Sequence, residues 1–395
     1  MSQNPSLKIK MFLNALDRGQ NGSIRLQLPD GSDRQLGTGQ TICEGKVASW
    51  SVFEGIIARG DIAFAESYID GSFDVNRPDE LIAWACENEA RMRPAIYGKR
   101  IASLFDRLRH LGRKNTQTQA RKNISSHYDL GNEFYGLWLD STLTYSSALY
   151  RSPADSLEAA QAAKYERILD QLGAKQGDHI LEIGCGWGGF LSHAVKHRDC
   201  KVTAITISQR QFEACQARIR EEGLGQRAEV LLEDYRNIKG KYDHVVSIEM
   251  IEAVGEAYWA EYFAKVRSSL IGRGRAVVQA ITIREDLFGR YRAGTDFIQQ
   301  YIFPGGQLLT QSAFSRYGND AGLEVVDLNA FASSYERTLR EWKIRFIAAR
   351  PEISRLGFGE EFFRLWELYL AYCEGAFRVG RTSVCQVTLE AVRHA

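Results

Sequence analysis

The chain has 395 residues, of which 44% are hydrophobic and 25% charged, and its 50 basic and 49 acidic side chains leave a formal net charge of +1. The hydrophobic fraction excludes a disordered chain, and the net charge argues against a protein that binds nucleic acid through its overall charge. Seven scattered cysteines form neither a CxxC pair nor a Cys/His metal spacing, which favours free thiols and predicts no metal site. No apolar run approaches the roughly 20 residues that cross a bilayer, so we expect a cytoplasmic protein.

Residues 1–111 are expected to form a small α/β domain that binds lipid or membrane. Turn signals lie at Pro29-Asp30-Gly31 and Asp70-Gly71 and divide the region into short elements. The polar stretch 112–123 that follows is typical of a linker.

Positive charge is concentrated between Arg91 and Lys122. This segment holds ten Lys/Arg and one acid, Asp106, so its charge of +9 leaves −8 for the rest of the chain. Apolar side chains recur there at helical spacing, with the cations on the other side. The pattern fits a surface helix packed by its apolar face. It equally fits a helix lying on an anionic phospholipid membrane, where each cation contributes about 1 kcal/mol. Both interpretations stay open.

Residues 124–395 are predicted to form a larger α/β domain. Short β-branched segments alternate there with helical patterns of 10 to 15 residues, which indicates a mostly parallel sheet covered on both faces. A segment at about 284–322 interrupts the expected order of strands. The predicted strands are 179–183, 201–207, 228–232, 244–248 and 275–283, and the predicted helices include 209–222 and 257–270.

A glycine-rich loop, Gly184-Cys-Gly-Trp-Gly-Gly189, follows the first of these strands and opens a helix. Its spacing matches a dinucleotide fingerprint, but that motif expects a carboxylate at the end of the second strand, where this chain has Ser208-Gln-Arg210. A nicotinamide or flavin enzyme is therefore the weakest alternative. Acids stand instead before the loop, at Glu182, and after the third strand, at Asp234. This combination favours a methyltransferase that uses S-adenosylmethionine (SAM).

Eight motifs together resemble the cyclopropane-fatty-acyl-phospholipid synthases, which add a methylene from SAM across a cis double bond of a phospholipid acyl chain. The resemblance implies a Rossmann-like class I SAM-methyltransferase fold with a seven-stranded sheet, and a homodimer. The motifs, in chain order, are HYDLGN from His127, YSS from Tyr145, the glycine loop, TIS from Thr206 with Gln211, DYR from Asp234, EAVG from Glu252, YIFPG from Tyr301 and YERTL from Tyr335.

The cofactor site follows from the resemblance and from the two acids. The family's SAM contacts match Tyr145, Ser146, Gly184, Gly186, Thr206, Ile207 and Gln211. The adjoining residues Glu182, Cys185, Gly188, Asp234 and Tyr235 complete the predicted SAM site.

The resemblance also implies a bicarbonate ion that acts as the base and is held by Cys, Glu, His and Tyr. Glu252 and Tyr335 match two of these positions, but the Cys position is Ser147 and the His position is Gln279. Ser and Gln donate hydrogen bonds, yet neither exchanges a proton near neutral pH as His does. Bicarbonate binding is therefore an open question, and C-methylation without ring closure becomes an alternative to cyclopropane formation. We place His127 near the substrate entrance.

Two further acids follow the fourth strand. Glu256 suits the start of a helix, where the dipole favours a carboxylate, and the role of Glu249 stays open.

Two other functions compete with a phospholipid-modifying enzyme at the inner face of the membrane. The first is a SAM-dependent methyltransferase of a soluble small molecule, which explains the glycine loop but not the basic segment. The second is a non-catalytic lipid-binding relative that lost its base with Ser147 and Gln279.

Overall fold

The computed structural model describes residues 4–96 and 130–392, and the chain divides into two compact units. Unit 1 combines Met1–Gly112, Arg290–Ile302 and Trp342–Arg381; unit 2 combines Arg113–Gly289, Phe303–Glu341 and Thr382–Ala395. The predicted linker 112–123, His127 and most of the basic segment lie outside the described residues. The predicted domain limits remain predictions.

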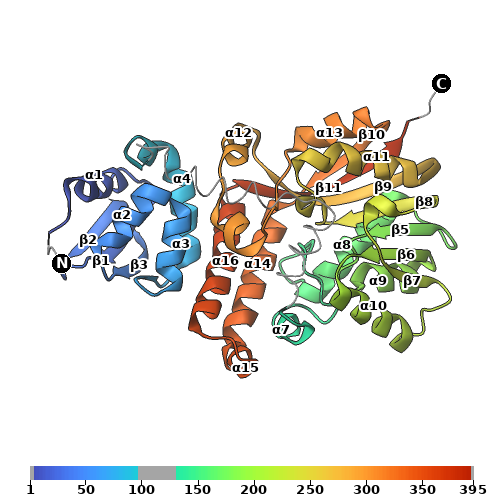
Figure 1. Ribbon diagram of the computed structural model, residues 1–395, viewed down its shortest axis with the longest axis horizontal. Coiled ribbons are helices and arrows are strands. Elements are labelled where there is room, and N and C mark those ends of the chain that lie inside the picture. Colours follow the sequence, from blue (N-terminus) through green and yellow to red (C-terminus); the bar gives the residue numbers. More distant parts are fainter. Residues whose placement is uncertain (1–3, 97–129, 393–395) are drawn as a thin grey trace. The chain divides into compact units, whose positions relative to one another are not determined.

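Unit 1 contains a four-stranded sheet with helices packed beside it (Figure 1). The strand order is β2-β1-β3-β4, and Gly31 turns the chain between β1 and β2 at a φ of 85°. Glycine adopts this left-handed conformation without strain, which explains the predicted turn. The strands are β1 Gly22–Gln27, β2 Asp33–Thr38, β3 Thr41–Val47 and β4 Phe73–Val75; the helices are α1 Leu7–Leu16, α2 Trp50–Arg59, α3 Asp61–Ile69, α4 Pro78–Ile96, α15 Arg350–Arg355 and α16 Glu360–Arg378.

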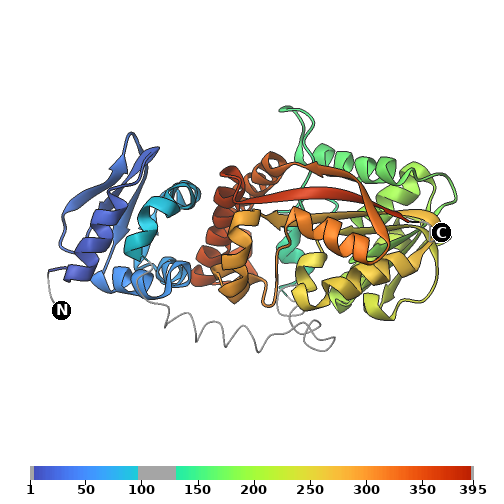
Figure 2. The same ribbon diagram turned by 90° about the horizontal axis from the view of Figure 1, so that it is seen from above.

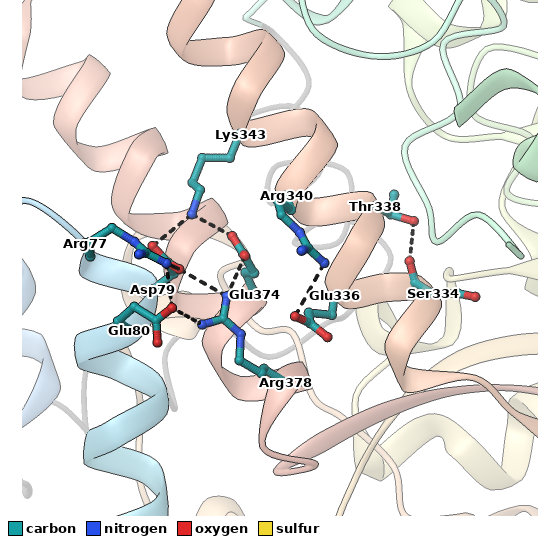
Figure 3. Close-up of polar contacts among 10 residues, drawn as sticks. All are labelled: Arg77, Asp79, Glu80, Ser334, Glu336, Thr338, Arg340, Lys343, Glu374 and Arg378. Atoms are coloured by element: carbon teal, nitrogen blue, oxygen red, sulfur yellow. Dashed lines mark hydrogen bonds and ion pairs between the residues drawn. The ribbon is translucent and has the colours of Figure 1, made fainter. Parts of the chain in front are cut away.

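A buried ion cluster joins α4, α16 and the C-terminal part of α14 (Ala332–Ala348) within unit 1 (Figure 3). Lys343 Nζ lies 3.1 Å from Asp79 and 2.6 Å from Glu374. Arg378 lies 3.1 Å from Asp79, 2.7 Å from Glu374 and 2.9 Å from Glu80. The two cations bridge acids from two different helices, so the cluster fixes how these helices pack.

Unit 2 contains the seven-stranded sheet, in the order β10-β11-β9-β8-β5-β6-β7 (Figure 1). The five strands from β9 to β7 are parallel, and β11 is antiparallel to both β9 and β10. The carboxyl ends of the parallel strands therefore meet at one edge, where doubly wound folds bind ligands. The strands are β5 His179–Ile183, β6 Lys201–Thr206, β7 Ala228–Leu232, β8 Tyr242–Ile248, β9 Leu270–Ile283, β10 Leu323–Ala330 and β11 Thr382–Ala391.

Helices cover both faces of this sheet, as the sequence pattern predicts (Figures 1 and 2). Alternate strand residues belong to two separate cores: Leu181 and Val245 to one, Ile180 and Val246 to the other. The period of two is the mark of a strand buried on both sides. Helices α11 Trp259–Ser269 and α13 Gln311–Asp320 supply the first core, and α8 Leu157–Leu172, α9 Gly189–Arg198 and α10 Gln209–Glu221 the second.

The predicted Rossmann-like fold with a smaller α/β region is thus confirmed, with differences in detail. Strand β9 begins at Leu270, five residues before the predicted start at Arg275, because Leu270 already pairs with Tyr242 across a register shift. Between β9 and β10 lie α12 Glu285–Ala293, the π-helix Ile298–Ile302 and α13. Within the described residues, no helix is both long and apolar enough to span a bilayer.

Candidate active site

The glycine loop joins β5 to α9 in a conformation that requires its glycines. Gly184 and Gly186 have φ values of 83° and 51°. A Cβ on Gly184 would lie 2.7 Å from Met250 Cγ, so the loop packs against the segment that follows β8. A Cβ on Gly186 meets nothing within 4 Å, so open space borders this part of the loop. Close approach of a ligand to the backbone is therefore possible here.

The side chains around this loop fit a cationic nucleotide cofactor. The Glu182 carboxylate is buried at the end of β5, and its Oε2 has no hydrogen-bond partner among the described residues. Burial raises the pKa of Glu182 well above its usual range, and a nearby cation would lower it again. The Cys185 side chain instead belongs to the core, and its thiol lies 3.7 Å from the Cys215 thiol.

The ends of β6 and β7 place the next predicted cofactor residues at the same edge of the sheet. Thr206 Oγ1 donates a 2.8 Å hydrogen bond to Gln211 Oε1, and both side chains are buried. Ile207 is half-buried and follows directly. The Asp234 carboxylate binds the Arg236 guanidinium at 2.9 and 2.8 Å, so Arg236 orients it, and the half-buried Tyr235 ring lies 5.4 Å from the same guanidinium.

The Tyr145-Ser146-Ser147 segment is held by α8. Lys164 Nζ donates a 2.8 Å hydrogen bond to Ser146 Oγ, and Gln161 Nε2 donates to the Ser146 carbonyl at 3.0 Å. Burial lowers the pKa of Lys164 to about 7, although the carboxylates of Glu249, Asp140 and Glu182 act in the opposite direction. The Ser146 hydroxyl therefore makes a structural contact with Lys164.

Three of the predicted catalytic residues converge on Glu249. Its Oε1 accepts hydrogen bonds from the Ser147 backbone N–H (2.8 Å) and from Gln279 Nε2 (2.7 Å). Its Oε2 accepts one from the Tyr335 hydroxyl at 2.6 Å. We call Glu249, Glu252, Ser147, Gln279 and Tyr335 the carboxylate cluster. Glu249, whose role could not be assigned from sequence, thus lies at the centre of the carboxylate cluster.

The backbone of Glu249 is strained. Its φ of 50° lies in the left-handed region, which costs a residue other than glycine about 1–2 kcal/mol. Such a conformation persists only where the surroundings fix it, and it is commonest at functional sites. The three hydrogen bonds of its carboxylate supply that fixation.

The donors to Glu249 are themselves oriented by neighbours. Gln386 Nε2, on β11, donates to Gln279 Oε1 at 3.0 Å, so the amide nitrogen of Gln279 faces Glu249. The Ser147 hydroxyl donates to the Ala148 carbonyl and does not contact Glu249. Thr338 on α14 accepts the Ala148 N–H at 3.1 Å, which positions the preceding N–H of Ser147. Ser147 therefore contributes through its backbone alone.

Glu252 lies beside Glu249 in a different environment. Its Oε1 accepts a hydrogen bond from the Ile281 N–H at 2.5 Å, while its Oε2 is buried without a partner among the described residues. Burial, followed by the charge of Glu249, raises the pKa of Glu252 to about 8. The protonated form of Glu252 is therefore favoured at neutral pH.

Aromatic side chains surround Tyr145. Its ring centroid lies 5.5 Å from those of Tyr135 and Trp138, and 6.5 Å from that of Phe303. Phe303 belongs to the YIFPG motif, so this motif borders the YSS motif. Aromatic faces stabilise a nearby cation.

Lys164 and Gln161 were not among the residues predicted from sequence. Both lie on the buried face of α8, in register with Leu157, Ile168 and Leu172. A lysine and a glutamine inside an apolar helical stripe are a signal, because such residues are buried only when they have partners. Glu256, by contrast, begins a short 3-10 helix and contacts Gln307, in keeping with its predicted place at a helix start.

Comparison with known proteins places the chain in a family. Residues 115–387 match the family model for mycolic acid cyclopropane synthetases. The chain is 39% identical over 349 residues to the tuberculostearic acid methyltransferase UfaA1 of Mycobacterium tuberculosis, covering 84% of this chain and 79% of that protein. It is 32% identical over 348 residues to the cyclopropane-fatty-acyl-phospholipid synthase of Escherichia coli K12, covering 87% and 86%.

A solved structure supports the same conclusion. The mycolic acid cyclopropane synthase CmaA1, in complex with SAH and CTAB, has a TM-score of 0.65 and 28% identity, covering 68% of this chain and 98% of that one. With the glycine loop and the open, carboxylate-lined edge beside it, these matches show that the chain is a SAM-dependent methyltransferase of the cyclopropane synthase family.

Proposed function

We propose that the protein transfers the methyl group of SAM to a cis double bond in an acyl chain of a membrane phospholipid, and that the product is an open, C-methylated chain. The observation that carries the proposal is the carboxylate cluster, which lies beside the glycine loop and contains both acids and hydrogen-bond donors. The E. coli relative is named for phospholipid acyl chains and the M. tuberculosis relative for methyl transfer to a fatty acid.

Different residues of the chain would bind SAM and the substrate. Glu182, the glycine loop, Thr206, Gln211 and Asp234 would hold SAM. When bound, SAM supplies an electrophilic methyl group on a sulfonium. An alkene is a weak nucleophile, so the site must align the double bond with this methyl and exclude water. No base is needed until the methyl has been transferred.

Charge in the substrate would develop as the methyl is transferred. The π electrons of the double bond would form the new C–C bond while the electron pair of the S–CH₃ bond leaves with the sulfur, and the neighbouring carbon would become a cation. The Tyr145 and Phe303 rings and the Glu249 carboxylate are suited to stabilise it. Loss of a proton from the new methyl would close a ring, whereas loss after a hydride shift, or from an adjacent carbon, leaves an alkene.

The open-chain product is supported by two departures from the family pattern. Gln279 and Ser147 stand at the positions where the resemblance implies a His and a Cys, and Gln279 holds a carboxylate instead of exchanging protons itself. The M. tuberculosis relative is also named as a methyltransferase, not as a cyclopropane synthase. A saturated product would need a hydride donor, and we do not propose one.

The experiment is product identification with SAM carrying a ¹³CH₃ methyl and vesicles of a cis-unsaturated phospholipid. Cyclopropanes and methylated alkenes are isomers, so mass spectrometry must be combined with proton NMR. We expect a one-carbon gain in the acyl chain and no high-field cyclopropane signal. A cyclopropane signal would overturn the open-chain product, and an unchanged acyl chain would overturn the proposed function.

We also propose that the enzyme works as a peripheral protein at the inner face of the membrane. The charge of +9 in residues 91–122 supports this, since anionic phospholipid attracts basic segments. Sedimentation with anionic vesicles should remove the protein from the supernatant at low salt and less so at high salt. Protein that stays in the supernatant at low salt would favour a soluble substrate. The homodimer stays a prediction.

A further inference from the structure

The carboxylate of Glu249 is surrounded by hydrogen-bond donors, as a buried anion requires. It accepts hydrogen bonds from a backbone N–H, a side-chain amide and a phenol, which come from three separate segments of unit 2. A carboxylate offers about four lone-pair directions. Among the described residues three are used, so one direction stays open. The residue is half-buried and not sealed in the core.

We propose that Glu249 is the general base of the reaction, taking the proton that the methylated acyl chain must lose. This inference rests on the proposed function, because it concerns a step that exists only if an alkene is methylated. It assigns to the chain's own side chain a task that otherwise requires an external anion.

The position of Glu249 suits this role. It directly follows β8 at the carboxyl edge of the sheet, and the next residue, Met250, packs against Gly184 of the glycine loop. Ser147, whose N–H binds it, adjoins Ser146 and Tyr145. Glu249 is therefore next in the chain to a residue that packs against the glycine loop, and its carboxylate binds the segment that carries Tyr145.

Its charge state also suits a base. Burial raises the pKa of Glu249, which makes it a stronger base than an exposed carboxylate, while Tyr335, Gln279 and the more distant Lys164 favour the ionised form. Glu252 suits the task less at neutral pH, because burial and the charge of Glu249 raise its pKa to about 8 and favour its protonated form.

The step balances without another reactant. After methyl transfer, a C–H bond on a carbon next to the cationic carbon breaks, and its electron pair forms the double bond of the methylated alkene. The proton passes to an oxygen of Glu249, which becomes neutral. Release of this proton to solvent after product departure restores the anion.

The first test compares Glu249→Gln with a matched variant, Glu256→Gln, in an acid that lies seven residues on and has no role in the cluster. Gln keeps the shape of the side chain but removes the basic oxygen. We expect Glu249→Gln to lower product formation by about 100-fold or more, as loss of a general base does. SAM binding, measured by calorimetry, and the activity of Glu256→Gln should be unchanged. If the wild-type enzyme forms the methylated product and Glu249→Gln forms it equally fast, the inference is overturned and the proposed function stays intact.

The second test separates a base from a merely structural residue. Glu249→Gly relieves the left-handed backbone, since glycine adopts a φ of 50° freely. It also leaves the Ser147 N–H, Gln279 Nε2 and Tyr335 hydroxyl facing vacated space. We expect this variant to be inactive and to regain activity with added formate or bicarbonate. A Glu249→Gly enzyme that binds SAM normally but is not rescued by either anion would contradict a role as base.

Discussion

Each unit of the protein buries a group of acidic side chains, and the two groups differ in the cations that accompany them. In unit 1, Asp79 and Glu374 lie between Lys343 and Arg378. Burial alone would raise the pKa of Asp79, but Lys343 and Arg378 more than offset it, and the pKa is lowered. In unit 2, burial and Glu249 raise the pKa of Glu252 to about 8.

Because their cations differ, the acidic groups of the two units have different roles. Acids with matched cations stay ionised and hold helices together (Figure 3). In the described part of unit 2, Lys164 favours the ionised form of Glu249, but burial lowers the pKa of Lys164 itself to about 7. Incomplete compensation leaves the pKa values of both carboxyl groups raised, and perturbed pKa values are common where protons are transferred. Four variants sharpen this contrast.

The largest effect is expected from Lys343→Met in unit 1. Removing one partner from a buried ion cluster leaves Glu374 and Asp79 undercompensated and costs about 3–5 kcal/mol in the free energy of unfolding. Urea unfolding followed by tryptophan fluorescence measures it. The control is Arg355→Met, which removes an exposed pair with Glu352 and should cost less than about 1 kcal/mol. Equal losses in both variants would mean that the cluster has no special role.

Gln279→Leu should have the next largest effect, this time on activity. It removes the amide that orients Glu249, and we expect kcat to fall about tenfold, or about 1.4 kcal/mol. Gln386→Leu is the matched variant, since it leaves the contact between Gln279 and Glu249 in place. Its loss of kcat should be smaller. The reverse order would show that orientation of Glu249 does not limit the reaction.

Glu252→Gln tests the protonated partner through pH. Folding raises the pKa of Glu252 from an ordinary 4.5 to about 8, so the folded protein binds this proton more tightly than the unfolded chain. Wild-type stability should therefore fall as pH rises from 4.5 through 8. The variant lacks this slope, and we expect it to be more stable than wild type at pH 9 by about 1 kcal/mol or more. Parallel stability curves from pH 5 to 9 would show that Glu252 is ionised throughout.

The smallest effect is expected from Ser147→Ala. The Ser147 hydroxyl donates to the Ala148 carbonyl, and Glu249 is bound by the backbone N–H, which alanine retains. We expect kcat to fall less than about threefold, or roughly 0.6 kcal/mol. A loss as large as that of Gln279→Leu would show that the hydroxyl itself acts in the reaction.

Much of the fold could be predicted from sequence because it depends on local patterns. The limits of β5 and β7 agree with the predicted ones, since the apolar run of β5 ends at Gly184 and that of β7 ends at Glu233. The start of β9 at Leu270 could not be predicted, because Gly272 and Gly274 are turn signals and the pairing depends on β8. The long connection through α14, α15 and α16 is divided between the two units at Glu341 and Trp342, inside α14. No local signature in the sequence marks this boundary.

The site was predictable only in part. The order of the motifs identified Ser147, Gln279 and Tyr335 as candidates. The role of Glu249, by contrast, depends on its left-handed φ and on hydrogen-bond donors at least 30 residues away in sequence. No local pattern encodes such an arrangement. Lys164 had a usable signal in its apolar helix face, whereas the roles of His127 and bicarbonate remain predictions.

The most direct test of the central claim, that Glu249 supplies the base, is the turnover of the wild-type enzyme in buffer freed of carbon dioxide and bicarbonate. Methylated acyl product is measured on unsaturated phospholipid vesicles before and after bicarbonate is restored. If Glu249 is the base, the two rates are equal within error. A rate that collapses on depletion and recovers with bicarbonate would contradict the account.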